Sequence, residues 1–457
     1  MLEVPGIEKI IGIEVYATKC EGIGGAIKRA PEDFIVEEIL IDGSRASVRP
    51  EEARINNIMD HGRYLICLLI KREVDTILAV EEIARKIGVS HDRVSFAGIK
   101  DTNALTAQYI SIGGVPASKV LQANISGFLI KPLGYSNEEI SSRKLFGNKF
   151  TITVREVKLD EKRIYERIDR IISELEDFGG IPNFFGHQRF GTNRPITHLV
   201  GKHIIKGDFR EAALTFLTYV SPFEGHRAKE ARSELYETMD FKAALKKFPK
   251  TLVYERAMLK HLAKSPGDYI GAFSKIPLSL RTLFIESYQS YLFNRFLSER
   301  IKRGIPLKEA QIGDCVVMLN SAGLPTKKFI RVRSENISFV NDEIRAGRMA
   351  VALPLVGPKQ QLSEGLQGEI EKEILEEEGV SGEDFERASM IRVKLFGGLR
   401  AALEKIIDLR MEVISGDKAT GNSVKFEFTL HKGTYATVVL REFMKPKNDE
   451  ELVKCGF

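Results

Sequence analysis

The stretch VSFAGIKDTNALTAQ, residues 94–108, is the most informative part of this sequence. Its first part is apolar and β-branched, which predicts a buried strand over residues 94–100. Lys100 and Asp101 then stand at the strand end, and a Thr-Asn pair turns the chain away. A carboxylate fixed there is ionised at neutral pH, since the reference pKa of Asp is about 3.9, and can act as nucleophile or base. An ordinary turn with an Asx hydrogen bond fits the same residues.

The first 160 residues, which include this stretch, combine short strands with few helices. Runs rich in Ile, Val, Phe and Tyr predict strands over residues 34–40, 64–70, 108–112 and 150–157. One helix is expected between Asp75, as its N-cap, and Gly88. An amphipathic helix is expected over residues 160–178, closed by Gly179. This pattern predicts a mixed α+β domain.

The middle of the chain is richer in helices and charge. Helices are predicted over residues 209–219, 224–247 and 277–303, with short strands at 315–319 and 329–332. Strand character returns at residues 391–395, 411–414, 424–430 and 436–440. Because the two ends of one domain often lie close together, this order predicts an inserted domain. We expect one domain from residues 1–182 and 395–457, and a second from residues 183–394.

Composition is typical of a globular protein and excludes fibrous and disordered classes. The 457 residues are 43% hydrophobic and 29% charged, with a formal net charge of +5. Ten Asp and Glu residues against only Lys372 and Arg387 fall within residues 361–388, so the rest of the chain carries the positive surplus. That surplus suits a surface facing phosphates, although lysines scattered over solvated helix faces would give the same total.

The cysteines and the N-terminal region indicate a soluble, cytoplasmic protein. The four cysteines are far apart and form no CxxC pair, which argues against a zinc knuckle or a disulfide scaffold and favours a reducing compartment. Charged residues interrupt the first apolar stretch, unlike the core of a signal peptide, and no apolar run approaches the roughly 20 residues of a membrane-spanning helix.

Common cofactor and catalytic motifs are absent from the sequence. It contains no GxxxxGK[ST], no complete dinucleotide fingerprint, no GxSxG and no HExxH. His198 and His203 are five positions apart, on different helical faces, so a shared metal is not expected. We therefore expect no metal and no cofactor, and chemistry that depends on a carboxylate, a lysine or a hydroxyl group.

Seven sequence blocks, in order, resemble motifs of the TruD family of tRNA pseudouridine synthases. FAGIKDTNALTAQ is similar to the family motif FAG-x-KD-x-x-A-x-T-x-Q. The others are IKRAPEDFIVE from residue 27, GNKFTITVREV from 147, IPNFFGHQRFG from 181, SYQSYLFN from 287, ALPLVG from 352 and GTYATVVLREF from 433. Together they span nearly the whole chain.

The resemblance implies both a fold and a reaction. It implies a pseudouridine-synthase catalytic α+β domain with a mixed or antiparallel sheet, interrupted by an inserted α/β TRUD domain. The implied reaction converts a uridine of tRNA, usually at position 13, to pseudouridine without a cofactor. The implied partner is tRNA, with no membrane and no protein partner, and the oligomeric state stays open.

The family motifs also imply roles for individual residues. Asp101 would be the catalytic aspartate, and Phe150 would stack on the target base, although a core phenylalanine at a strand start fits equally. Asn148 would hydrogen-bond near the aspartate or the uracil edge. Lys28 would lie beside the carboxylate and keep it ionised. Lys100 is the alternative partner, but neighbours on an extended chain tend to point to opposite faces.

Other matched residues have less specific roles. Gln188 and Arg189 suit phosphate contact or positioning, but a hinge between domains explains QRFG equally well. Bacterial family members commonly have a basic residue after KD, where this chain has Thr102. Contacts to the tRNA backbone are expected from basic patches in the inserted domain, at Arg227, Lys229 and Arg232, at Lys246, Lys247 and Lys250, and at Lys327, Lys328, Arg331 and Arg333.

Two other functions also fit parts of the sequence. One is an RNA-binding protein whose chemistry has been lost, against which the intact KD, N-x-F and QRFG elements argue. The other is a glycosidase that uses two carboxylates, with Asp33 or Glu37 as the second. Their place in a strand with alternating faces favours structural roles for both.

Overall fold

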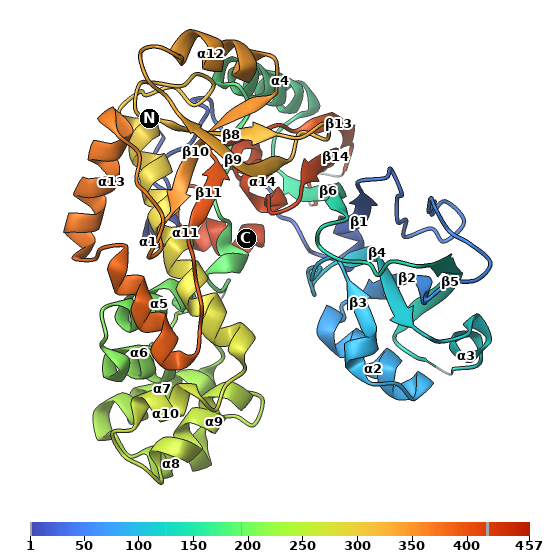
Figure 1. Cartoon of the computed structure of the whole chain (residues 1–457), viewed down its shortest axis with the longest axis vertical. Helices are drawn as coiled ribbons and strands as arrows, with labels where there is room; N and C mark the ends of the chain where they lie inside the picture. Colours follow the sequence, from blue (N-terminus) through green and yellow to red (C-terminus); the bar gives the residue numbers. More distant parts are fainter. Residues whose placement is uncertain (1, 124, 193, 417–419) are drawn as a thin grey trace. The chain divides into compact units, whose positions relative to one another are not determined.

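The computed structural model describes residues 2–123, 125–192, 194–416 and 420–457 (Figure 1). It divides into two compact units. Unit 1 comprises Met1–Lys19, Pro182–Leu403 and Lys447–Asp449, and unit 2 comprises Cys20–Ile181, Glu404–Pro446 and Glu450–Phe457. Two of the five passages of the chain between the units fall within short strands, β7 (Ile181–Pro182) and β12 (Leu403–Glu404).

The N-terminal residues differ from the predicted boundary, because they group with the middle of the chain. They include α1 (Gly6–Ile10), and their carbonyl groups accept hydrogen bonds from the long helix α11 (Leu278–Lys302). Asn294 Nδ2 donates to Ile11 O at 2.9 Å, and Ser298 Oγ donates to Gly12 O at 2.8 Å. These bonds are invisible to a prediction based on local composition.

Within the described residues, unit 2 is built on an eight-stranded mixed sheet. The strand order is β13-β14-β6-β1-β4-β2-β5, with β3 beside β4; β1 and β4 are parallel and the other pairs are antiparallel. The strands are β1 (Phe34–Leu40), β2 (Tyr64–Arg72), β3 (Val94–Phe96), β4 (Leu105–Gly113), β5 (Phe128–Ser136), β6 (Leu145–Val157), β13 (Ile407–Ile414) and β14 (Asn422–His431).

Alternation of side chains along β2 and β4 gives the sheet a core on each face. Leu65, Cys67 and Leu69 pack with the apolar side of α2 (Thr76–Ile87) on one face. Ile66, Leu68 and Ile70 pack with Tyr109 on the other. As predicted, the Asp75 side chain caps α2 and Gly88 ends it in a left-handed conformation.

The remaining helices of unit 2 include one that matches its prediction and one that does not. Asp160 caps α4 (Glu161–Phe178) and Gly179 ends it, as expected. The strand predicted over residues 436–440 was wrong, because this segment begins α14 (Ala436–Met444). All nine residues of α14 are buried, so the packing of the segment overrides the strand preference of its β-branched residues. The other helices are α3 (Ala117–Gln122) and α15 (Asp449–Cys455).

Unit 1 combines helices with a four-stranded antiparallel sheet in the order β11-β10-β8-β9. Because its strand pairs are antiparallel, this unit is α+β and not α/β as predicted. Its strands are β8 (Cys315–Leu319), β9 (Pro325–Arg331), β10 (Met349–Leu355) and β11 (Gly398–Ala401). Further helices are α5 (Thr197–Ile205), α6 (Phe209–Thr218), α9 (Val253–Leu262), α10 (Tyr269–Phe273), α12 (Ile337–Arg345) and α13 (Gly365–Glu378).

Two further predictions in this part of the chain need correction. The helix predicted over residues 224–247 is two helices, α7 (His226–Thr238) and α8 (Phe241–Lys247), because Met239 is left-handed and Asp240 caps the second. The strand predicted over residues 391–395 follows a 3₁₀ segment (Glu383–Ile391) and is irregular. None of the helices in the described parts of the chain has the length and apolar character needed to cross a membrane.

Gly147 explains why the GNKF element begins with glycine. It lies in β6 between Ile39 of β1 and His431 of β14. A Cβ atom added there would lie 2.0 Å from the carbonyl oxygen of Leu430, which is backbone and cannot move aside cheaply. The glycine therefore permits the close pairing of β6 and β14 next to Asn148.

We expect Gly147→Ala to lower the free energy of unfolding by about 1–3 kcal/mol, because it forces these strands apart. Chemical denaturation measures this change. Gly113→Ala is the matched control, because Gly113 is a strand glycine of the same sheet whose added Cβ would meet nothing closer than 3.7 Å. Equal losses in the two variants would contradict the steric explanation.

Candidate active site

Asp101 lies on a loop and not at a strand end as predicted. Strand β3 ends at Phe96, and residues 97–104 form an irregular loop before β4, which we call the aspartate loop. Side chains take the place of strand pairing in fixing its backbone. Lys100 N donates to Thr76 Oγ1 at 3.1 Å, and Gln108 Nε2 donates to Gly98 O at 3.1 Å.

The carboxylate of Asp101 forms an ion pair with Lys28. Lys28 Nζ lies 2.8 Å from Asp101 Oδ2, and the two side chains are 14% and 23% exposed, so solvent reaches the pair. Asp101 Oδ1 accepts from Asn103 N at 3.2 Å, so the Asx turn is also present. Lys28 has a φ of 58°, an uncommon conformation for a residue with a side chain, and its ammonium lies 4.6 Å from the centroid of the Phe34 ring.

Lys100 points away from Asp101, as alternation along an extended chain suggests. Its Nζ lies 2.7 Å from Glu38 Oε1, and both side chains are buried. Glu38 Oε2 also accepts from Tyr109 N at 3.0 Å. Glu38 was not among the predicted site residues, although alternation along β1 places it on the same face as Phe34 and Val36 and so could have indicated it.

The two carboxylates nominated for a glycosidase have structural partners. Asp33 is buried, pairs with Arg155 at 2.6 Å and accepts from Ala30 N at 3.0 Å. Glu37 Oε1 accepts from Val48 N at 2.9 Å. Both carboxylates therefore have hydrogen-bonding partners within the fold.

Asn148 and Phe150 lie on β6, on the face that carries Glu38. In the register of the sheet, Asn148 is opposite Glu38 and Phe150 is opposite Val36, and side chains of directly paired residues share a face. Phe150 is 6% exposed and packs edge-on against Phe34, with ring centroids 6.3 Å apart. Phe34 therefore contacts both Phe150 and the Lys28 ammonium that holds Asp101.

The side chain of Asn148 is incompletely satisfied. Its Oδ1 atom is buried and has no hydrogen-bond partner among the described residues. A buried amide oxygen without a partner carries a desolvation cost, so such an atom in a native site is a candidate acceptor for a substrate donor.

Gln188 and Arg189 belong to unit 1, whereas the other predicted residues belong to unit 2. They lie in the short 3₁₀ turn His187–Arg189. Arg189 is tied into its own unit: its guanidinium donates to Glu286 Oε2 at 3.0 Å, and its carbonyl oxygen accepts from Ser287 Oγ at 2.8 Å. Gln188 is exposed.

Only some of the basic residues predicted to contact RNA are exposed. Arg232 is 1% exposed and pairs with Glu224 and Glu255 inside unit 1, so it is not a surface charge. Arg331 donates to the carbonyl of Leu362 and pairs with Glu364. Lys327 and Lys328 of β9 are exposed.

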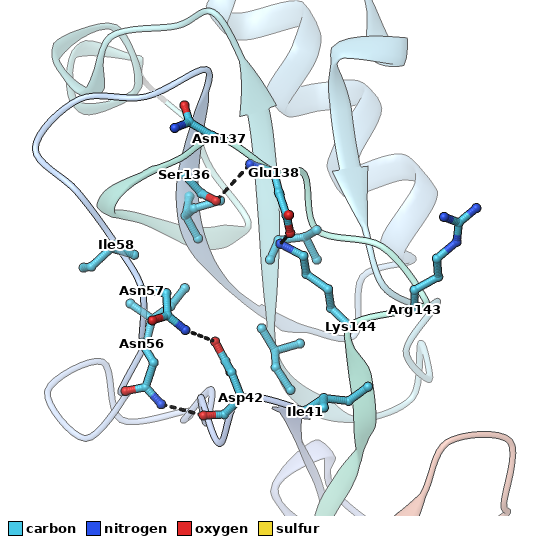
Figure 2. A pocket seen from close by; sticks show the side chains of 14 residues that line it. Ile41, Asp42, Asn56, Asn57, Ile58, Ser136, Asn137, Glu138, Arg143 and Lys144 are labelled. Carbon is cyan, nitrogen blue, oxygen red and sulfur yellow. Dashed lines mark hydrogen bonds and ion pairs between the residues drawn. The ribbon is translucent and has the colours of Figure 1, made fainter. Parts of the chain in front are cut away.

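A pocket of about 560 Å³ lies elsewhere in unit 2 (Figure 2). Apolar residues such as Ile41 and Ile58 form part of its lining. Among its polar residues, Asn57 donates to Asp42, and Glu138 pairs with Lys144 at 2.9 Å. None of the predicted site residues lines it. The candidate site is therefore the surface around Asp101.

Comparisons with known proteins show the family of this chain. A family model described as tRNA pseudouridine synthase D (TruD) matches residues 10–443. Relatives bearing the name "Probable tRNA pseudouridine synthase D" include one from Methanococcoides burtonii, 39% identical over 97% of this chain and 98% of its own, and one from Methanosarcina acetivorans, 40% identical over the same shares. A crystal structure of a TruD protein from Methanosarcina mazei superposes with a TM-score of 0.80 at 39% identity, covering 97% of this chain and 99% of that one.

These matches identify the class of enzyme as a tRNA pseudouridine synthase, an isomerase. Within that class, the chain belongs to the TruD family. The family resemblance read from the sequence motifs is confirmed. The α+β fold class with a mixed sheet is confirmed as well, whereas the inserted domain predicted as α/β has a separate antiparallel sheet.

We expect Lys100→Met to lower the free energy of unfolding by about 3–5 kcal/mol, because it leaves the buried Glu38 carboxylate without its partner. The double variant Lys100→Met/Glu38→Gln removes that charge while keeping an acceptor for Tyr109 N, and should recover most of the loss. Chemical denaturation of both variants measures this. A double variant as unstable as the single one would contradict the pairing.

Proposed function

We propose that this protein converts one uridine of tRNA to pseudouridine with Asp101 as the catalytic carboxylate. The observation that carries the proposal is the ion pair of Asp101 and Lys28 on an anchored loop, linked through Phe34 to Phe150. The Lys28 ammonium, 2.8 Å from the carboxylate, places an opposite charge beside the group that the chemistry requires.

The reaction needs a positioned carboxylate and no external group. The N1–C1′ bond of the uridine breaks, the uracil turns, C5 bonds to C1′, and the proton lost from C5 is balanced by one gained at N1. Asp101 can serve by attacking C1′, by attacking C6 of the base, or by abstracting a sugar proton. All three routes require the target nucleotide to leave its stack, because a stacked base gives no access to the sugar.

Phe150 and Asn148 suit the uracil half of the substrate. We assign Phe150 to stacking on the target base, which contributes roughly 1–3 kcal/mol and suits a base that must turn while it is retained. We assign the unpaired Oδ1 of Asn148 to an N–H donor on the uracil edge. The positive charge of Lys28 balances the negative charge of the Asp101 carboxylate until the sugar of the substrate binds.

The two units take different parts in this proposal. Unit 2 acts as the pseudouridine-synthase catalytic domain, and unit 1 as the family-specific inserted domain. Gln188 and Arg189 of unit 1 then serve to position the RNA. The support is that unit 2 contains Asp101, Lys28, Asn148 and Phe150, and that unit 1 interrupts its chain.

The target we propose is position 13 of tRNA, the usual site of the family. Mapping pseudouridine in tRNA from cells with and without this protein tests that choice. Loss of the modification at position 13 alone supports it, whereas loss at a different position keeps the chemistry and replaces the target.

Asp101→Asn is expected to abolish pseudouridine formation while the protein still folds and binds tRNA, because the amide is isosteric but is neither a nucleophile nor a base. Product is measured by nucleoside analysis after single turnover. Asp33→Asn is the control, since Asp33 bonds Arg155 and should affect stability more than the rate. Product formation by Asp101→Asn at the wild-type rate would remove this residue from the mechanism.

Phe150→Leu should lower the single-turnover rate by about 5- to 150-fold, the equivalent of roughly 1–3 kcal/mol of stacking. Phe426→Leu is the control, because Phe426 is also a buried aromatic residue of the sheet and its ring packs against Phe443. A purely structural Phe150 would give two variants that lose stability alike and keep the rate.

A further inference from the structure

Lys71 is a buried lysine whose partners are main-chain carbonyl groups. It is the penultimate residue of β2 and is 1% exposed. Its Nζ atom donates to the carbonyl oxygen of Asp101 at 2.9 Å and lies 3.4 Å from that of Lys100. The neighbouring lysines, Lys28 and Lys100, instead pair with carboxylates.

Burial of the Lys71 ammonium lowers the stability of the fold. Burial lowers the pKa of the Lys71 ammonium to about 8, although the charges of Asp101 and Asp75 act in the opposite direction. Lys100 adds to the lowering. An apolar side chain of similar length would avoid the cost of burying a cation. The lysine is therefore better explained by what it holds than by stability.

Lys71 fixes the backbone on both sides of the Asp101 Cα atom. The peptide N–H of Lys100 donates to Thr76 Oγ1, and the carbonyls of Lys100 and Asp101 both face Lys71. These peptide groups set the direction of the Asp101 side chain. The Asp101 carboxylate is thereby already oriented toward Lys28.

We infer that Lys71 is a positioning residue of this enzyme, which holds the aspartate loop so that the Asp101 carboxylate stays aligned with the substrate sugar. The inference rests on the proposed role of Asp101. Lys71 acts through the backbone of the loop, touches no substrate, and should influence the chemical step more than the binding of tRNA.

The test is Lys71→Met in the full chain, with an unmodified tRNA transcript as substrate. Misplacement of a catalytic group by about 1 Å costs on the order of 100-fold in rate, so we expect the single-turnover rate to fall by about 10- to 100-fold. The dissociation constant for tRNA should stay within about twofold of wild type, since no RNA contact is lost. Lys71→Gln keeps an N–H donor and should recover part of the rate.

Leu65→Ala is the matched control for a merely structural role. Leu65 lies on the same strand, six positions before Lys71, and is 1% exposed, but it packs in the α2 core. It should lower the melting temperature at least as much as Lys71→Met and keep the single-turnover rate. Circular dichroism confirms that each variant is folded before rates are compared.

A wild-type rate in folded Lys71→Met, or an equal loss of rate in Leu65→Ala, would overturn the inference. If Lys71→Met does not fold, Lys71→Gln decides: a reduced rate supports the role and a wild-type rate overturns it. Failure of the underlying function is distinguishable, because it would appear as an active Asp101→Asn variant.

Discussion

The parallel pairing of β1 with β4 is the constraint on which the candidate site depends. Ile35 is paired with Leu105, so the starts of both strands lie at the same edge of the sheet. Lys28 precedes one strand and Asp101 precedes the other, which brings residues 73 positions apart in sequence within 2.8 Å. An antiparallel pairing would have placed the two segments at opposite ends of the strands.

Three lysines near this edge meet three different electrostatic conditions. The Lys28 and Asp101 pair is partly exposed, so a substrate can reach the carboxylate. The Lys100 and Glu38 pair is buried, and each charge compensates the other. Lys71 is buried against main-chain carbonyl groups, and burial lowers the pKa of its ammonium group. Only the first arrangement leaves a charged group available for chemistry.

The sequence predicted the regular elements well where a local signal existed. The strand over residues 34–40 and the caps Asp75 and Asp160 agree with the structure, because alternation and capping are local properties. The segment 94–100 was predicted as one strand because its residues are apolar, yet it leaves the sheet after Phe96. The side chains of Thr76 and Gln108 fix the loop that follows, and periodicity within the segment does not predict either hydrogen bond.

The same reasoning explains why the family motifs point to Asp101 and Lys28 but not to Thr76 and Lys71, which hold the aspartate loop. A lysine at the end of a strand has the same local sequence whether it faces solvent or a buried carbonyl, so Lys71 gave no signal until its neighbours were known. Asn148 and Phe150 are held by the pairing of β6 with two strands. Asp101, on a loop, lacks that support, and the buried side chains around it supply the rigidity that the sheet supplies to the others.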